Sequence, residues 1–294
     1  MSPVLGPTPA GAQPRDGGRE RSALEASIDA IRAEGLTVEF TSRRGTRRQT
    51  LRAVDGVDLT LHQGETLALV GESGCGKSTL VRTIFGLNPI AAGQVSVFGQ
   101  DVATATPRQR LAMRRRIQMV FQDPFSSLNP HLTAHEIIAE PLRINRVYSR
   151  ERVTELFEQV GLTRDSFGKR PAEFSGGQRQ RIGIARALAL DPDVLVLDEP
   201  VSALDVSVQA QVLNLLADLQ ERLGLSYLFI AHDLSVIRHI ATRVAVMQRG
   251  RIVELGTRDA VFTAPAHPYT SLLLGSVPVP DPHRRPAALA TSPS

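Results

Sequence analysis

The chain has 294 residues, of which 42% are hydrophobic and 22% charged, and its formal net charge is +4. These values are typical of a globular protein with a large core, and no apolar run reaches the roughly 18 residues that a membrane-spanning helix needs. The single cysteine excludes a disulfide or a cysteine-based metal cluster within the chain, and the arginine clusters lack the interleaved aromatic residues of a nucleic-acid-binding surface.

The N-terminal part of the chain changes character near residue 27. Residues 1–26 are rich in proline, glycine and alanine, which predicts a disordered leader, and they lack the basic start and apolar core of a secretory signal. Alternating apolar residues then predict two strands of a small antiparallel sheet, separated by a basic turn at 42–49. Phe40 ends the first of these strands, where an aromatic residue ordinarily packs into the core.

A glycine-rich segment follows the apolar run 66–70 and precedes a helical pattern. Its spacing, Gly-x-x-x-x-Gly-Lys-Ser, is that of a phosphate-binding P-loop, so the protein is expected to bind a nucleoside triphosphate. Glycines let the backbone wrap around a polyphosphate, and N–H groups at the helix start point at the anion. Lys77 is placed to reach the β- and γ-phosphates and Ser78 to ligate Mg²⁺. The predicted phosphate-binding residues are Gly71, Glu72, Ser73, Gly74, Cys75, Gly76, Lys77, Ser78 and Thr79.

The rest of the chain alternates helical patterns with short, continuous apolar runs. A helical insertion is predicted over about 104–185, followed by strands at 194–197 and 227–230 with a helix over about 207–223 between them. A hairpin that turns at 249–250 comes next. This alternation predicts an α/β fold with a mostly parallel core sheet covered on both faces, an N-terminal antiparallel β subdomain and an inserted helical subdomain.

Two acidic residues, Asp198 and Glu199, directly follow the apolar strand 194–197. They are therefore expected at the carboxyl end of a central strand, where open α/β sheets bind ligands. Asp198 is placed to hold Mg²⁺ through water, and Glu199 to accept a proton from an attacking water. His232 ends the next strand and is a further candidate for the same site.

The sequence Ser-Gly-Gly-Gln at 175–178 lies between the P-loop and Asp198. Alone it is a common loop before a helix, with Ser175 as the N-cap. Its order and spacing relative to the other motifs resemble the signature motif of ATP-binding-cassette (ABC) ATPases, although Phe174 stands where the general motif has leucine. The resemblance covers residues 28 to about 258, and the other matching positions are Gln122 for the Q-loop, Asp205 for the D-loop, His232 for the switch histidine and Phe40 for the adenine-stacking A-loop.

The resemblance implies that two cassettes meet head to tail. Ser175, Gly176 and Gly177 of one cassette would donate to the γ-phosphate on the other cassette's P-loop, at the start of a helix whose dipole favours anions. ATP then joins the cassettes, and hydrolysis lets them separate. The residues implied to act are Lys77, Glu199 and His232 in catalysis, Ser78, Gln122 and Asp198 in Mg²⁺ binding, and Phe40, Gln178 and Asp205 in nucleotide binding.

Three stretches resemble the oligopeptide/dipeptide importer ATPases, and among them the second, F-type subunit. They are 122–142, 198–207 and the tail with His-Pro-Tyr-Thr at 267–270. The resemblance implies a related D-type ATPase as partner, two integral-membrane permeases and, indirectly, an extracytoplasmic solute-binding protein. The chain would be peripheral on the cytoplasmic face of the inner membrane. A groove beside Gln122 is the expected place for a permease helix.

The expected organisation is a leader at 1–26, an ABC ATPase domain at 27–264 and a partly disordered tail at 265–294. The expected function is ATP-driven import of di- or oligopeptides. Because the ATPase never touches the cargo, import of nickel or another small solute stays open as an alternative, as does a non-transport ABC ATPase that acts on nucleic acid. Nucleic acid is not expected as a partner, since the chain has no sustained heptad run of the kind found in the DNA-repair relatives.

Overall fold

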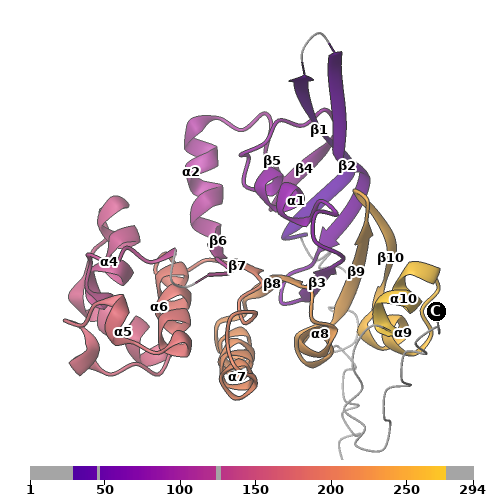
Figure 1. Ribbon diagram of the computed structural model, residues 1–294. Helices are drawn as coiled ribbons and strands as arrows, with labels where there is room; N and C mark the ends of the chain where they lie inside the picture. The colour runs from indigo at the N-terminus through magenta and orange to yellow at the C-terminus, as the bar shows by residue number, and fades with distance from the viewer. Residues whose placement is uncertain (1–28, 45–46, 124–126, 276–294) are drawn as a thin grey trace, which may run out of the picture.

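The computed structural model describes residues 29–44, 47–123 and 127–275, so the predicted leader and the end of the predicted tail lie outside the described residues. Two sheets and the helices around them make up this part of the chain (Figure 1). The strands are β1 (Ile31–Arg44), β2 (Arg47–Leu61), β3 (Thr66–Val70), β4 (Ala92–Val97), β5 (Gln100–Asp101), β6 (Ile117–Val120), β7 (Val194–Asp198), β8 (Ser226–Ala231), β9 (Arg243–Gln248) and β10 (Arg251–Thr257).

Most of the helices lie between strands in the chain, whereas α9 and α10 follow β10; α2, α4 and α10 have a proline in the first turn or the interior. Each of α2, α4 and α6 begins with a reciprocal capping box, which satisfies N–H groups that the helix itself leaves without partners. The helices are α1 (Lys77–Ile84), α2 (Pro107–Arg116), α4 (Ala134–Ile144), α5 (Arg150–Gln159), α6 (Gly176–Leu188), α7 (Val206–Leu223), α8 (Leu234–Ile240), α9 (Arg258–Thr263) and α10 (Pro268–Gly275), with 3₁₀ turns at Arg164–Ser166 and Pro171–Glu173.

The smaller sheet is antiparallel, in the order β2-β1-β4-β5. It differs from the prediction in two ways. The β1–β2 hairpin is longer, because its backbone pairing continues to Arg44 opposite Arg47, so Phe40 lies within β1 opposite Leu51 and does not end the strand. Hairpin pairing needs backbone groups and no apolar side chains, so the two strands continue into the arginine run, and the reversal between them falls inside the predicted range 42–49. In addition, β4 and β5 join this sheet after the P-loop helix.

The larger sheet has the order β10-β9-β3-β8-β7-β6, in which all neighbours except β10 and β9 pair in parallel. The predicted mostly parallel core sheet is confirmed. One strand differs: β6 falls inside the range 104–185 that was predicted as a helical insertion, and it pairs with β7 as an edge of the core sheet. Its four residues follow an arginine-rich helix and are too few to show a strand pattern of their own.

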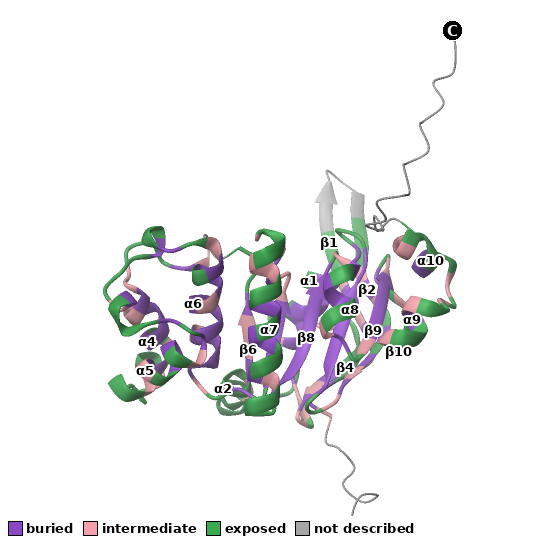
Figure 2. Ribbon diagram, turned by 90° about the horizontal axis from the view of Figure 1, so that it is seen from below, coloured by how far each residue is buried: buried purple, intermediate pink, exposed green. Residues whose placement is uncertain are grey.

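Side chains of the larger sheet alternate between two apolar clusters, one on each face. On one face, residues such as Ala68 and Leu195 pack with α4 to α8. On the other face, residues such as Leu67 and Val194 pack with α1 and with strands of the smaller sheet. Period-two alternation of a strand buried on both sides produces this division. Figure 2 shows the core strands buried and the outer sides of α2 and α7 exposed.

The register of the parallel strands brings three strand ends to one edge of the sheet. Val70 at the end of β3 is paired with Ala231 at the end of β8, and Asp198 at the end of β7 is paired with Ile230. The residues that follow these ends therefore lie close together, which is the usual place of a binding site in a parallel sheet. The helices α4, α5 and α6 form a group at the other side of the molecule from α9 and α10 (Figure 1).

Candidate functional site

The P-loop occupies the turn between β3 and α1, and two of its glycines are required by space as well as by conformation. Gly71 and Gly76 have φ of 154° and 116°, and a Cβ at either position would lie 2.1 Å from the carbonyl oxygen of Met247 or 2.2 Å from that of Ala53. Any larger residue would push the loop off its supports. Within the described residues, no side chain caps the start of α1, where Gly76 is the N-cap. The N–H groups there can therefore bind an anion.

Lys77 is buried beneath the loop that it follows. Its Nζ donates to the carbonyl oxygens of Gly71, at 2.6 Å, and Glu72, at 2.9 Å, and lies 3.7 Å from the Cys75 Sγ. The ammonium is thus held at the loop that the sequence predicts to cradle phosphates. The single cysteine is buried in the same place.

Three residues predicted for catalysis or metal binding meet at one carboxylate. Glu199 Oε2 accepts a hydrogen bond from Gln122 Nε2 at 2.7 Å, and His232 Nδ1 lies 3.2 Å from the same oxygen. Glu199 is largely buried, whereas His232 is more exposed. These side chains follow β6, β7 and β8, so the parallel register brings them together.

The backbone of Glu199 is held in an unusual conformation. Its φ of 46° lies in the left-handed region that residues other than glycine rarely adopt. Glu199 N donates to Ile230 O at 2.9 Å, and Ser202 Oγ donates to Glu199 O at 3.1 Å, and these bonds fix the turn. Such conformations persist where the surrounding structure determines them, and they concentrate at functional sites.

Asp198 lies beside this cluster in a setting that disfavours its ionised form. Burial raises the pKa of the Asp198 carboxyl, and the nearby Glu199 raises it further, while Lys77 and Arg82 act in the opposite direction. A cation bound here would relieve both unfavourable effects. The carboxyl group is therefore suited to a site that is completed by a positively charged ligand.

One cleft of about 820 Å³ contains most of the predicted site. The predicted residues that line it are Phe40, Ser73, Gly74, Cys75, Gly76, Lys77, Ser78, Thr79, Gln122, Asp198, Glu199 and His232, while Gly71 and Glu72 form the start of the loop.

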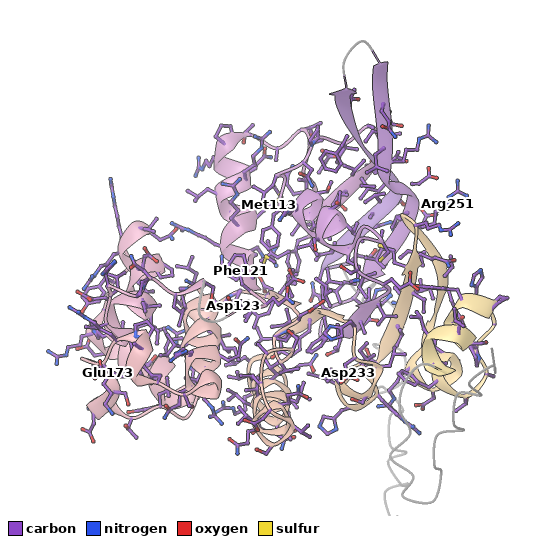
Figure 3. The ribbon with its side chains drawn as sticks, in the orientation of Figure 1. Met113, Phe121, Asp123, Glu173, Asp233 and Arg251 are labelled. Atoms are coloured by element: carbon purple, nitrogen blue, oxygen red, sulfur yellow. The ribbon has the colours of Figure 1, made fainter. Side chains whose placement is uncertain are left out.

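Sequence reasoning missed part of the cleft wall. Leu51 lies opposite Phe40 across the β1–β2 pair and is exposed beside the cleft, and the turn at Arg249 and Gly250 reaches the same wall. Gly250 N donates to Cys75 O at 2.8 Å, and Asp55 N donates to Gly250 O, so the turn joins β2 to the P-loop. The ion pair between Arg251 and Asp55 strengthens this junction at the edge where Figure 3 labels Arg251. The position of Leu51 beside Phe40 depends on the register of the β1–β2 pair, which alternation within one strand does not predict.

The remaining predicted residues lie elsewhere, at the starts of α6 and α7. Ser175 Oγ accepts from Gln178 N at 3.3 Å, and Gln178 Oε1 accepts from Ser175 N at 3.0 Å. Asp205 caps α7 by accepting from Ser207 Oγ at 2.7 Å and from Val208 N at 2.9 Å, and these two hydrogen bonds lower the pKa of the Asp205 carboxyl. Among the described residues that line the nucleotide cleft, none comes from 175–178 or is Asp205.

Gly177 closes the contact between these two helix starts. A Cβ on Gly177 would lie 2.4 Å from Val208 Cγ1, and one on Gly176 would lie 3.1 Å from Leu204 Cδ2. The Ser-Gly-Gly-Gln loop thus packs closely against the start of α7. The predicted site is divided into a cleft with a P-loop and a separate glycine-rich helix start that faces outward.

The site combines a P-loop, an acidic pair at the end of β7, and a glutamine and a histidine that contact the second residue of this pair. This combination defines a P-loop ATPase of the cassette type. A solved structure, described as a dimeric post-hydrolysis state of the ATP-binding cassette MJ0796 bound to ADP and phosphate, matches with a TM-score of 0.67 and 29% identity, over 78% of this chain and 98% of that one. The predicted ABC ATPase fold is confirmed by this likeness.

Family models and relatives agree with the site. Residues 54–202 match the model described as ABC transporter, and residues 253–293 match the one described as oligopeptide/dipeptide transporter, C-terminal region. The oligopeptide transport ATP-binding protein OppF of Escherichia coli is 56% identical over 80% of this chain and 72% of its own length. OppD of Mycobacterium bovis is 57% identical over 90% of this chain, which spans 44% of that relative.

The chain belongs to the ABC transporter family. It is an ATPase subunit of the branch that carries the oligopeptide/dipeptide C-terminal region, and the resemblance seen in the sequence is confirmed. In the part of the chain that the structure describes, no helix combines the length and the apolar character needed to cross a membrane.

Proposed function

We propose that this chain is the ATP-hydrolysing subunit of an importer that takes up di- or oligopeptides, and that it is the F-type member of a pair of ATPases. The observation that carries the hydrolytic role is the Gln122–Glu199–His232 cluster beside the P-loop. The peptide cargo is supported by relatives named oligopeptide transport ATP-binding proteins. Because relatives named OppD and OppF match almost equally well, the F-type assignment rests on the sequence stretches described above.

In this proposal ATP binds in the 820 Å³ cleft. Phe40 and Leu51 form the platform for the adenine ring, and the backbone of the P-loop surrounds the phosphates. Lys77 moves its ammonium group from the loop carbonyls to the β- and γ-phosphate oxygens. The phosphate oxygens of ATP thus replace the loop carbonyls as acceptors for the Lys77 ammonium group.

The cleft also fits a magnesium ion. Ser78, Gln122 and Asp198 line it together and offer a hydroxyl, an amide and a carboxylate oxygen, which are the ligand types that Mg²⁺ prefers. The ion supplies charge neutralisation between the phosphates when it is bound. A bound cation would favour the ionised form of Asp198, which burial and Glu199 disfavour by raising the pKa of its carboxyl group.

Glu199 is proposed to act on the attacking water. Gln122 and His232 fix the orientation of its carboxylate, which then accepts a proton from water while the water oxygen attacks the γ-phosphorus. The bond from the γ-phosphorus to the bridging oxygen breaks, and ADP and phosphate result. Oriented donors that face the developing charge lower the barrier.

A second cassette is proposed to complete the site. The exposed Ser175 and the N–H groups of Gly176 and Gly177 would donate to the γ-phosphate on a D-type partner's P-loop, and the partner's loop would do the same here. The MJ0796 structure that resembles this chain is described as dimeric. Asp205, which starts α7 beside this loop, would then lie at the same interface.

A second cleft, of about 670 Å³, offers a place for a permease helix. It is lined by exposed Phe121, seen below α2 in Figure 3, by charged residues such as Arg186 and Glu140, and by Gln122. Apolar and charged groups together suit an amphipathic helix. Because Gln122 belongs to both clefts, a helix docked here would act directly on the nucleotide site. The subunit would then lie on the cytoplasmic face of the inner membrane, below two permeases served by an extracytoplasmic binding protein.

The assignment is tested by purifying a tagged Glu199→Gln variant from membranes solubilised in ATP and Mg²⁺ and identifying what accompanies it. Recovery of a second cassette ATPase and two permeases supports the importer, and the ligands of the matching binding protein then show whether the cargo is peptide, nickel or another solute. Recovery from the soluble fraction alone, or with nucleic acid, contradicts the transport role.

A further inference from the structure

A tyrosine from the C-terminal helix reaches the P-loop. Tyr269 lies in α10 and is only 5% exposed. Its hydroxyl oxygen accepts a hydrogen bond of 3.1 Å from the backbone N–H of Glu72, the second residue of the P-loop, although the two residues are 197 positions apart in the chain. The contact joins the segment matched by the C-terminal region model to the nucleotide site.

The start of α10 is fixed to the larger sheet by a carboxylate of β10. Glu254 Oε1 accepts from Ala266 N at 2.9 Å and Glu254 Oε2 accepts from His267 N at 3.0 Å, while His267 Nδ1 accepts from Tyr269 N at 3.1 Å. Figure 1 shows α10 beside α9 at the β10 edge of the molecule. The position of the Tyr269 ring is therefore set by the sheet and by the His-Pro-Tyr segment.

The same P-loop residue is held from both sides. The Tyr269 hydroxyl oxygen accepts a hydrogen bond from the N–H of Glu72, and Lys77 Nζ donates to the carbonyl oxygens of Glu72 and Gly71. Burial raises the pKa of the Tyr269 hydroxyl, so it stays neutral and protonated near pH 7. A neutral oxygen is a suitable acceptor beside a loop that must receive a polyanion.

We propose that Tyr269 is a positioning residue for the ATP site, which holds the first turn of the P-loop in its phosphate-binding shape and makes ATP affinity depend on the docking of α10. This inference rests on the proposed nucleotide site. When ATP draws Lys77 away from the loop carbonyls, the bond to Tyr269 keeps Glu72 in place. Without it, the loop must be ordered by the nucleotide, and affinity falls.

The test replaces Tyr269 with Phe, which keeps the buried ring and removes only the acceptor. Tyr227→Phe is the matched control, because its hydroxyl is also buried and donates to Leu216 O at 2.8 Å, while Tyr227 pairs with Thr66 at the start of β3, the end remote from the P-loop. We expect Tyr269→Phe to weaken MgATP binding by about 3- to 10-fold, as loss of one useful hydrogen bond does. It should raise KM for ATP with kcat within about twofold, and the control should leave both unchanged.

Two further readouts separate positioning from general destabilisation. Hydrogen exchange of the Glu72 N–H should accelerate in Tyr269→Phe and not in Tyr227→Phe. Among the described residues, Glu254 hydrogen-bonds the start of α10 and not the P-loop. Glu254→Ala should therefore also weaken ATP binding, and combining it with Tyr269→Phe should add little to the larger single effect. Equal ATP affinity and equal Glu72 exchange in Tyr269→Phe and wild type overturn the inference. A wild-type protein that itself fails to bind MgATP instead refutes the nucleotide site on which it rests.

Discussion

The molecule contains two glycine-rich helix starts, and they differ in one physical respect. At α1 the N-cap is Gly76, which offers the helix no side-chain cap among the described residues, and Lys77, Asp198 and Glu199 line the same cleft as this helix start. At α6 the N-cap is Ser175, which closes its own capping box with Gln178 and is exposed. The first start is built to enclose a phosphate, and the second is already stable without one.

This difference shows why a single chain holds only half of each proposed ATP site. A helix start that is satisfied in isolation and directed outward can add donors to a ligand held by another molecule. The start of α6 lies with α4 and α5, away from α1 (Figure 1). The P-loop provides affinity, and the Ser-Gly-Gly-Gln loop is proposed to make hydrolysis depend on the partner. The predictions below alter one start at a time.

The largest effect is expected on the P-loop side, from Glu199→Gln. Loss of the proton acceptor should lower the rate of ATP hydrolysis by roughly 10²- to 10⁴-fold, while ATP affinity stays within about twofold. Phosphate release is the measurement. Glu155→Gln is the control, because Glu155 is an exposed residue of α5 whose ion pair in the described part of the chain is with Arg152, away from the cleft. A turnover within threefold of wild type would refute the role of Glu199.

On the signature side, Ser175→Asp separates capping from phosphate recognition. Aspartate caps helices as well as serine does, so the fold should be kept, but its charge would oppose the γ-phosphate of the facing cassette. We expect hydrolysis by the assembled transporter to fall by about 10²-fold, with ATP affinity of the isolated subunit unchanged. Ser175→Asn, a neutral cap, is the control and should lose far less. Equal loss in both variants would mean that Ser175 matters only for helix α6.

A smaller effect is expected from the adenine platform of the cleft. Phe40→Ala should weaken ATP binding about 10-fold, since stacking of a base on an aromatic ring contributes roughly 1–3 kcal/mol. Leu51→Ala, on the facing strand, should weaken it about 3-fold, because the aliphatic side chain offers apolar contact only. Titration with a fluorescent ATP analogue measures both. GTP binding should change less than ATP binding if the platform favours adenine, and unchanged ATP affinity in Phe40→Ala would remove Phe40 from the site.

The smallest effect concerns the stability of the free protein. The pKa of Asp198 is raised in the folded state above its unfolded value, so its ionisation opposes folding above the folded pKa, and this penalty disappears as the pH falls below the unfolded pKa. Asp198→Asn should therefore raise Tm by about a degree or two at pH 7 without nucleotide, and the gain should vanish at about pH 3, below the unfolded pKa. Thermal unfolding at the two pH values, with Mg²⁺-dependent hydrolysis abolished in parallel, is the check. A lower Tm at pH 7 would contradict the proposed penalty.

Local motifs were predictable, whereas contacts between distant segments were not. The P-loop, Asp198–Glu199 and His232 each follow an apolar strand, so the sequence alone places them at one sheet edge. The strands β5 and β6 are too short to show the alternation of apolar and polar residues that predicts a strand. The ends of β1 and β2 consist of arginines, a composition that is more typical of a turn. The Tyr269–Glu72 bond depends on packing between segments 197 residues apart, which no local pattern records.

The central claim is that the binding site around the ATP on one cassette's P-loop is completed by the Ser-Gly-Gly-Gln loop of the other cassette. The most direct measurement is photo-crosslinking of the membrane-embedded transporter with an ATP analogue that carries its reactive group on the γ-phosphate. The experiment uses this chain with Lys77→Ala, so that its own P-loop no longer holds the analogue. We predict that mass spectrometry will find the label on residues 174–178 of this chain. The account would be contradicted if the Lys77→Ala substitution abolished the label on residues 174–178, or if the label were found only around the P-loop that holds the analogue.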